Sequence, residues 1–158
     1  MLVKLGKYLR ILGYDARWDA RLRTHELILQ ANQDGRVFLT RNTQLPQQYP
    51  PVTKVLLIVD EDAALQLRQV VSAFDLEPQQ FLFSKCVQCN VPLETVSDKR
   101  DIESRIHPNV FARHRRFFTC RGCGTVFWHG SHVRNTCRKL GLPMPEPDAE
   151  TDQPTTGS

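Results

Sequence analysis

The chain of 158 residues is long enough for one ordinary domain, or for a small domain joined to a metal-stabilised module. Hydrophobic residues make up 41% of it and charged residues 24%, which is ordinary for a soluble globular protein. No apolar run approaches the roughly 20 residues that cross a bilayer, and no signal-peptide pattern follows Met1. We therefore expect an intracellular protein, cytoplasmic or nuclear, without a membrane partner.

Positive charge is concentrated in residues 84–142, which carry eleven Lys/Arg against four Asp/Glu. Residues 1–83 are nearly balanced, with ten basic against nine acidic side chains, and the tail from residue 143 has four acids and no base. A local excess of positive charge favours a polyanionic partner, of which nucleic acid is the usual one. A solvated basic surface without a partner is the alternative.

The first elements are expected to be two helices. Apolar residues recur at helical spacing from Leu2 to Leu12, and Gly13 is placed to end that helix. Tyr14–Trp18 is a candidate for a short strand. Thr24 is expected to cap a second helix that runs through Asp34 and stops at Gly35.

Two strands and a third helix follow. Val37–Leu39 is expected to be a buried strand, and Val55–Val59, with five consecutive apolar residues, a strand covered on both faces. Asp60 or Asp62 then caps a helix. Alternating strands and helices predict an α/β domain with a parallel sheet, whose sites lie at the carboxyl ends of the strands. The polar residues near those ends are Asp19, Asn42 and Asp60.

The expected sheet is one strand short, because the chain opens with a helix where a doubly wound unit ordinarily begins with a strand. An unpaired sheet edge recruits other strands, so self-association through this edge is expected. We divide the chain into an α/β domain at 1–80, a zinc ribbon module at 81–142 and a disordered tail at 143–158, which is rich in Pro, Asp, Glu and Thr.

Four cysteines form two Cys-x-x-Cys pairs, Cys86 with Cys89 and Cys120 with Cys123. Zinc favours four soft ligands in a tetrahedron, so this pattern predicts one structural zinc ion. The 30 residues between the pairs exceed the usual ~15–20. Widening a flexible loop by that factor costs only ~0.5 kcal/mol of closure entropy, against ~10–16 kcal/mol of apparent zinc binding.

Other readings of these residues are weaker. A redox Cys-x-x-Cys usually opens a helix in a thioredoxin-like unit, whereas two copies occur here in basic surroundings. His129 and His132 could replace a cysteine ligand, although four thiolates already complete the shell. Cys137 is left over and is expected to be a buried thiol.

Several stretches resemble one family, the Mut-seven C-terminal RNase domain. Phe83-Ser84-Lys85-Cys86-Val87-Gln88-Cys89-Asn90-Val91-Pro92-Leu93 looks like its first cysteine knuckle, and the stretch 118–132, which ends in Trp128-His129-Gly130-Ser131-His132, resembles its second. The opening Met1–Asp15 is similar to the family's first helix, and Gly35–Arg41 to its middle strand. The likeness covers roughly residues 1–140, and the knuckles are its specific part.

The resemblance implies a PIN-like nuclease fold joined to a zinc ribbon, and divalent-metal-dependent cleavage of RNA. Acidic side chains would hold catalytic Mg²⁺ or Mn²⁺, which activates water and stabilises the phosphate. The candidates here are Asp19, Glu26, Asp60 and Asn42. Each acid also has an ordinary explanation, Glu26 as a favourable charge near a helix N-terminus and Asp60 as a helix cap.

RNA is the partner that the resemblance implies, whether single-stranded or structured. Arg41 could bind a phosphate bidentately, and the ribbon would contact the RNA backbone or stack on a base. Trp128 or Phe127 is the stacking candidate, with packing of Trp128 inside the ribbon as the alternative. The nucleic-acid-binding candidates are Arg41, Arg113, Arg115, Arg116, Arg121, Trp128 and His132.

This sequence departs from the family pattern in two places. The family usually has an aspartate on a strand before the first helix, and the chain starts at that helix. The family's Leu-Thr-Arg-Asp is Leu39-Thr40-Arg41-Asn42 here. Loss of two carboxylates weakens divalent-metal affinity. The alternatives to a ribonuclease are therefore an RNA-binding module that has lost metal chemistry and, more weakly, a protein-interaction module that docks through its ribbon.

Overall fold

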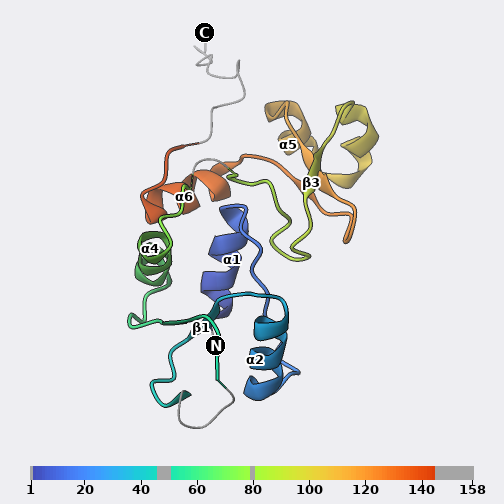
Figure 1. Cartoon of the computed structure of the whole chain (residues 1–158). Helices are drawn as coiled ribbons and strands as arrows, with labels where there is room; N and C mark the ends of the chain where they lie inside the picture. Colours follow the sequence, from blue (N-terminus) through green and yellow to red (C-terminus); the bar gives the residue numbers. More distant parts are fainter. Residues whose placement is uncertain (1, 46–50, 79–80, 145–158) are drawn as a thin grey trace. The chain divides into compact units, whose positions relative to one another are not determined.

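The computed structural model of the chain describes residues 2–45, 51–78 and 81–144 (Figure 1). The expected disordered tail, 143–158, thus lies outside the described residues from 145 onward. The chain divides into two compact units, residues 1–82 and 83–158. No helix in the described ranges is long and apolar enough to span a membrane.

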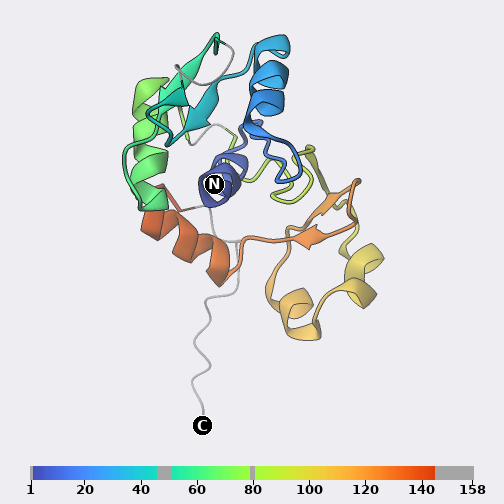
Figure 2. The same ribbon diagram turned by 90° about the horizontal axis from the view of Figure 1, so that it is seen from below.

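The first unit is a small mixed α/β unit. Its elements are α1 (Val3–Ile11), α2 (Thr24–Gln33), β1 (Phe38–Thr40), β2 (Val55–Leu57) and α4 (Ala63–Ala73). The two strands run parallel, with Phe38 opposite Val55 and Thr40 opposite Leu57. Figures 1 and 2 show the strands between α2 and α4. This pairing confirms the prediction of a parallel sheet in the first unit.

Helix α1 is the best predicted element of this unit. Leu5, Leu9 and Leu12 are 0%, 6% and 0% exposed, so the helical apolar spacing corresponds to a buried stripe. Gly13 follows with φ of 86°, and the amide of Tyr14 donates to the carbonyl of Leu9 at 3.0 Å. A left-handed residue with this backbone bond ends a helix, and glycine adopts it without a steric penalty.

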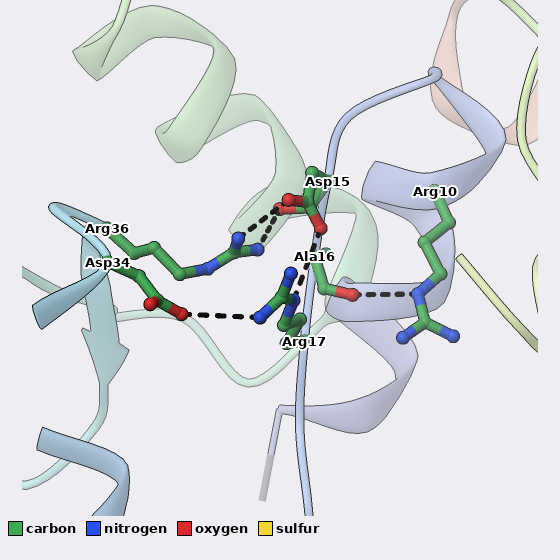
Figure 3. Close-up of polar contacts among 6 residues, drawn as sticks. All are labelled: Arg10, Asp15, Ala16, Arg17, Asp34 and Arg36. Atoms are coloured by element: carbon green, nitrogen blue, oxygen red, sulfur yellow. Dashed lines mark hydrogen bonds and ion pairs between the residues drawn. The ribbon is translucent and has the colours of Figure 1, made fainter. Parts of the chain in front are cut away.

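The prediction of a strand over Tyr14–Trp18 is wrong. The segment is irregular, and side chains rather than a neighbouring strand satisfy its carbonyls (Figure 3). Arg10 donates from Nε to the carbonyl of Ala16 at 2.8 Å, and Arg36 donates to the carbonyl of Asp15 at 2.7 Å. Because both acceptors are occupied by arginines, the segment needs no ladder partner.

Strand β2 is not covered on both faces, contrary to the prediction for Val55–Val59. Val55, Leu57 and Val59 are 47%, 40% and 71% exposed, whereas Ile58 is 2% exposed. Alternate residues of a strand point to opposite faces. One face of β2 therefore carries apolar side chains into solvent.

The helix caps differ in part from expectation. Thr24 is the first residue of α2 rather than its cap, and Glu26 in the first turn accepts the Arg23 amide at 2.7 Å instead. Gly35, with φ of 64°, follows α2 as expected. Asp62 caps α4 by accepting the amides of Ala64 and Leu65 at 2.8 and 3.2 Å.

The second unit contains a three-stranded antiparallel sheet. Its strands are β3 (Leu93–Thr95), β4 (Phe118–Cys120) and β5 (Val126–Phe127), in the order β3-β4-β5. Helix α6 (Ser131–Leu140) follows them and carries the buried Cys137, as the sequence predicts.

The stretch between the cysteine pairs is folded rather than a flexible loop. It forms the 3₁₀-helix η1 (Lys99–Arg105) and helix α5 (Pro108–Arg113). Lys99 joins them by donating to the carbonyls of Phe111 and His114 at 2.8 and 3.2 Å. Ile102 and Phe117, 2% and 0% exposed, supply apolar burial. The estimate of closure entropy for a flexible loop therefore does not apply here.

Candidate functional site

The four cysteines of the two pairs come together as the sequence predicts. The sulfur atoms of Cys86, Cys89, Cys120 and Cys123 all lie within 4.8 Å of one another, and those of Cys86 and Cys123 are 3.8 Å apart. They are the only group of three or more cysteine, histidine or acidic side chains found close enough to share an ion within residues 2–45, 51–78 and 81–144.

The two halves of the cluster are built by the same backbone turn. In the first, the Cys86 carbonyl accepts the amide of Asn90 at 2.9 Å, and in the second the Cys120 carbonyl accepts the amide of Gly124 at 2.8 Å. Asn90 and Gly124 both have left-handed backbone, with φ of 64° and 71°. Glycine and asparagine tolerate this conformation best. A sequence of Cys-x-x-Cys followed by one of these residues therefore encodes the turn locally.

Backbone amides approach the sulfur atoms closely. The amide of Cys89 is 3.4 Å from the sulfur of Cys86, and that of Gly122 is 3.3 Å from the sulfur of Cys120. A Cβ atom at position 122 would lie 3.2 Å from the Cys89 sulfur, so glycine is favoured there. Such amides stabilise thiolates, the form in which cysteine binds metal.

Without a cation, the four thiols affect one another's ionisation, so that some lose their protons much less readily than others. The neighbouring Cys123 thiol is the main cause that raises the pKa of Cys89 to about 12, and burial raises the pKa of Cys86. The hydroxyl of Thr125, 3.1 Å from the Cys123 sulfur, lowers the pKa of that thiol to about 6. A divalent cation favours all four thiolates at once. Four converging soft ligands could therefore hold a metal ion such as zinc.

A second feature is a pocket at the carboxyl ends of β1 and β2. It has a volume of 240 Å³ and is lined by Leu2, Lys4, Arg41, Glu61, Asp62, Ala63 and Gln66. Nη2 of Arg41 is 3.2 Å from Oε1 of Glu61. Gln66, 5% exposed, donates to the carbonyl of Asp60 at 2.9 Å and so fixes the turn that follows β2.

The polar residues predicted for the strand ends have different surroundings. Asn42 and Asp60 follow β1 and β2 at the same edge of the sheet. Asn42 accepts the amide of Gln44 at 2.9 Å, whereas the carboxylate of Asp60 makes no hydrogen bond or ion pair with another described residue. Asp60 therefore keeps both carboxylate oxygens available.

The other two acids are already engaged. Asp19 binds Arg21 through both carboxylate oxygens, at 2.9 and 2.7 Å, and the side-chain hydrogen bond to Arg21 is the main cause that lowers the pKa of Asp19 to about 2. Glu26 serves as the helix-capping carboxylate of α2. Glu26 lies in the first turn of α2, where the ordinary explanation of a favourable charge near a helix N-terminus places it, and the structure adds its hydrogen bond to the Arg23 amide.

Apart from Arg41, which belongs to the first unit, the predicted nucleic-acid-binding residues lie in the second unit. Arg113, the last residue of α5, is exposed, as are Arg115 and Arg116 between α5 and β4. Arg121 forms an ion pair with Glu94 at 2.6 Å. The side chain of His132 lies outside the described part.

Trp128 is half-buried beside the ring of Phe117, with 6.5 Å between ring centroids. A Cβ at position 130 would come within 2.6 Å of its Nε1. These contacts match the packing alternative for Trp128. His129, considered as a substitute ligand, lies against the rings of Phe83 and Phe118 at 5.2 and 5.3 Å.

Sequence reasoning missed Lys4, Glu61 and Gln66 as pocket residues. They come from α1, the turn after β2, and α4, which are distant in the sequence. The one signal that could have indicated Glu61 is its place directly after a predicted strand, where parallel sheets put their sites.

The fold and the cysteine cluster together define a mixed α/β protein with a second unit that could bind a metal ion. The family model of the Mut7-C RNAse domain matches residues 1–140, and the chain belongs to this family. The resemblance in its cysteine knuckles and first helix is thereby confirmed. Comparison with curated proteins gave no match, and comparison with solved structures gave none either.

Proposed function

We propose that this chain is a divalent-metal-dependent ribonuclease with a PIN-like α/β domain and an RNA-binding zinc ribbon. The observation that carries the proposal is the common edge at which β1 and β2 end, where Asn42 and Asp60 follow the strands and a pocket of 240 Å³ opens. Membership of an RNase domain family supports RNA as the substrate.

Asp60 is the strongest candidate for a metal-binding carboxylate. Its carboxylate is uncommitted among the described residues, and Asn42 offers an amide oxygen at the same edge. Oxygen atoms of this kind suit Mg²⁺ and Mn²⁺, which are commonly held by one or two carboxylates together with substrate phosphates. The bound ion would supply an activated water and charge stabilisation at the phosphate. We expect the site to bind it weakly without RNA.

Asp19 and Glu26 have supporting roles in this proposal. Asp19 would have to exchange its bidentate contact with Arg21 for a metal ion, and Glu26 would have to leave the Arg23 amide. Both exchanges cost charge-assisted hydrogen bonds. We therefore expect substitution of Asp60 to lower cleavage more than substitution of either of these acids.

The second unit is proposed to bind one structural zinc ion and the RNA backbone. The cysteine cluster supplies four sulfur ligands, and the exposed Arg113, Arg115 and Arg116 supply positive charge near it in sequence. Zinc replaces part of the core that so small a unit lacks. The arginines then bind phosphates with little sequence preference.

One observation favours the alternative of an RNA-binding module without activity. No group of three acidic or histidine side chains gathers at the strand ends within the part of the chain that is described. The amide of Asn42 also lacks the charge of a carboxylate. In this alternative the ribbon still binds RNA, and the α/β unit serves only as a scaffold.

Cleavage of a labelled single-stranded RNA by the zinc-loaded protein tests the proposal. Mn²⁺ should be added to, or left out of, a buffer without chelator, because a chelator would also remove the structural zinc. We expect cleavage that requires Mn²⁺ and is lost in Asp60→Asn. Glu103→Gln, which removes an exposed acid of η1, is the matched control. Retained binding without cleavage in the unmodified protein would establish the alternative.

A further inference from the structure

The pocket at the strand ends is bordered by the N-termini of two helices. Lys4 lies in the first turn of α1, a helix of nine residues, and Asp62 and Ala63 begin α4, a helix of eleven. Helix N-termini carry a partial positive charge from their unpaired amides. Helix dipoles and the cations of Lys4 and Arg41 therefore meet at one cavity.

Lys4 occupies an electrostatically unfavourable place. A cation near a helix N-terminus is repelled by the helix dipole, and α1 has no acidic residue in its first turn to offset it. The Lys4 ammonium makes no hydrogen bond or ion pair with any other described residue. An anion bound in the pocket would relieve this repulsion.

The acidic residues of the pocket, Glu61 and Asp62, each already have a contact. Oδ1 of Asp62 accepts two amides at the start of α4. Glu61 is paired with Arg41, and its side chain is 89% exposed. An ion pair this exposed contributes little, so Arg41 can turn to a stronger anion at small cost. Lys4, which has no carboxylate partner among the described residues, and Arg41, whose partner is exposed, are therefore the groups that the pocket can offer to an anion.

We propose that Lys4 and Arg41 bind a backbone phosphate of single-stranded RNA in this pocket. The inference rests on the proposed function and adds the residues that position the strand. Arg41 presents a planar fork that suits two phosphate oxygens, and Lys4 acts as a point charge. Gln66 donates to the carbonyls of Asp60 and Glu61 and so fixes the turn after β2, which forms part of the pocket wall.

Acylation of lysines, read by mass spectrometry, tests contact without any need for turnover. The zinc-loaded full chain is treated in buffer without Mn²⁺, with and without single-stranded RNA. Lys7 is the matched control, because it is an exposed lysine of the same helix that does not line the pocket. We expect RNA to reduce acylation of Lys4 and to leave Lys7 unchanged.

The outcomes separate this inference from the proposed function. If RNA binds but Lys4 reacts as before, the inference is wrong and the proposed function stands. If RNA does not bind at all, the proposed function fails, and the inference fails with it. Inorganic phosphate at the same phosphate concentration forms a further arm. If inorganic phosphate protects Lys4 from acylation as well as RNA does, the proposal that the pocket binds an RNA strand is wrong.

A salt titration of RNA binding distinguishes a phosphate contact from a structural role. For single strands, the slope of log K against log salt changes by about 0.7 for each phosphate contact. Because Lys4 and Arg41 contact the same phosphate, the double variant Lys4→Gln/Arg41→Gln should make the slope shallower by about that amount, and each single variant should do so by part of it. Lys7→Gln should leave the slope unchanged. An unchanged slope in the double variant would overturn the proposal even if affinity falls.

Discussion

Arg36 and Asp15 are joined twice, side chain to side chain at 2.6 Å and guanidinium to backbone carbonyl at 2.7 Å. The two residues are 21 positions apart, and the contact ties the segment after α1 to the residue that precedes β1 by two positions (Figure 3). Asp15 raises the pKa of Arg36 through the same hydrogen bond.

We expect Arg36→Ala to destabilise the first unit by about 1–2 kcal/mol. Hydrogen bonds to charged groups contribute ~1.5–3 kcal/mol, and the 46% exposure of the Asp15 side chain reduces this figure. Urea unfolding followed by Trp18 fluorescence, in a Trp128→Phe background, measures the loss. Arg68→Ala, at an exposed position of α4, is the control and should leave the midpoint unchanged.

Gly6→Ala tests the packing of Trp18 against α1. A Cβ at position 6 would lie 2.7 Å from two ring carbons of Trp18. Alanine favours a helix by ~1 kcal/mol over glycine, whereas overpacking costs ~1–3 kcal/mol. Trp18 also contacts Arg10, whose Cζ lies 3.8 Å from the ring centroid.

Because Trp18 has little room to move, we expect Gly6→Ala to lower the free energy of unfolding despite its better helix propensity. Gln30→Ala, on the exposed face of α2, should raise stability slightly in the same assay. An increase in stability for Gly6→Ala would show that Trp18 leaves its site easily.

The carboxylate of Asp19 should titrate at about 2, well below the ordinary 3.8, because Arg21 stabilises its charged form. The pair therefore favours the folded state above pH 3.8, and this contribution is lost as the pH falls toward 2. A carbon-detected NMR titration measures the midpoint. Arg21→Gln should raise it toward the ordinary value, and an unchanged midpoint would assign the shift to another cause.

The purified protein should bind about one zinc ion per chain. Cys120→Ser should abolish stoichiometric binding and the folded signal of Trp128, because four sulfur ligands are then reduced to three. Cys137→Ser is the matched control, since Cys137 is outside the cluster. Retention of the ion in Cys120→Ser would indicate that a residue other than the four cysteines completes the shell.

The self-association expected from the sequence relied on an unpaired sheet edge, and the structure adds an exposed apolar face on β2 as a second candidate contact. Gln69 covers part of the strand's backbone by donating to the carbonyl of Leu57 at 2.7 Å and accepting the amide of Val59 at 3.1 Å. The side chains stay uncovered. Val59→Lys should therefore reduce concentration-dependent association in sedimentation velocity, whereas Leu29→Lys, at an exposed apolar site of α2, should not. If the unmodified protein sediments as a monomer at every concentration, the expectation of self-association is wrong.

Local signals in the sequence predicted those parts of the structure that depend on neighbouring residues. The stripe from Leu5 to Leu12 and the turn at Gly13 are examples, since helical spacing and a left-handed glycine are encoded within one or two turns. The cysteine cluster was equally predictable, because each half is a short turn that ends in Asn90 or Gly124.

Long-range contacts were not predictable in this way. Tyr14–Trp18 looks like a strand in sequence, but its carbonyls accept hydrogen bonds from Arg10 and from Arg36, which is 21 residues beyond Asp15. Whether one or both faces of β2 are buried also depends on tertiary packing. A run of apolar residues alone does not specify this. Lys4 and Glu61 share a pocket through the order of the helices and strands, which leaves no periodic pattern to detect.

The folded stretch between the cysteine pairs enters and leaves the sheet at adjacent positions, because Thr95 at the end of β3 is opposite Phe118 at the start of β4. The Val96 amide also donates to the Phe117 carbonyl at 2.9 Å. Because the two ends of this segment are adjacent in the sheet, the rest of the unit does not depend on the segment being continuous. A protease cut within it would leave both fragments paired along β3 and β4, so the nicked protein should migrate as one species until it is denatured.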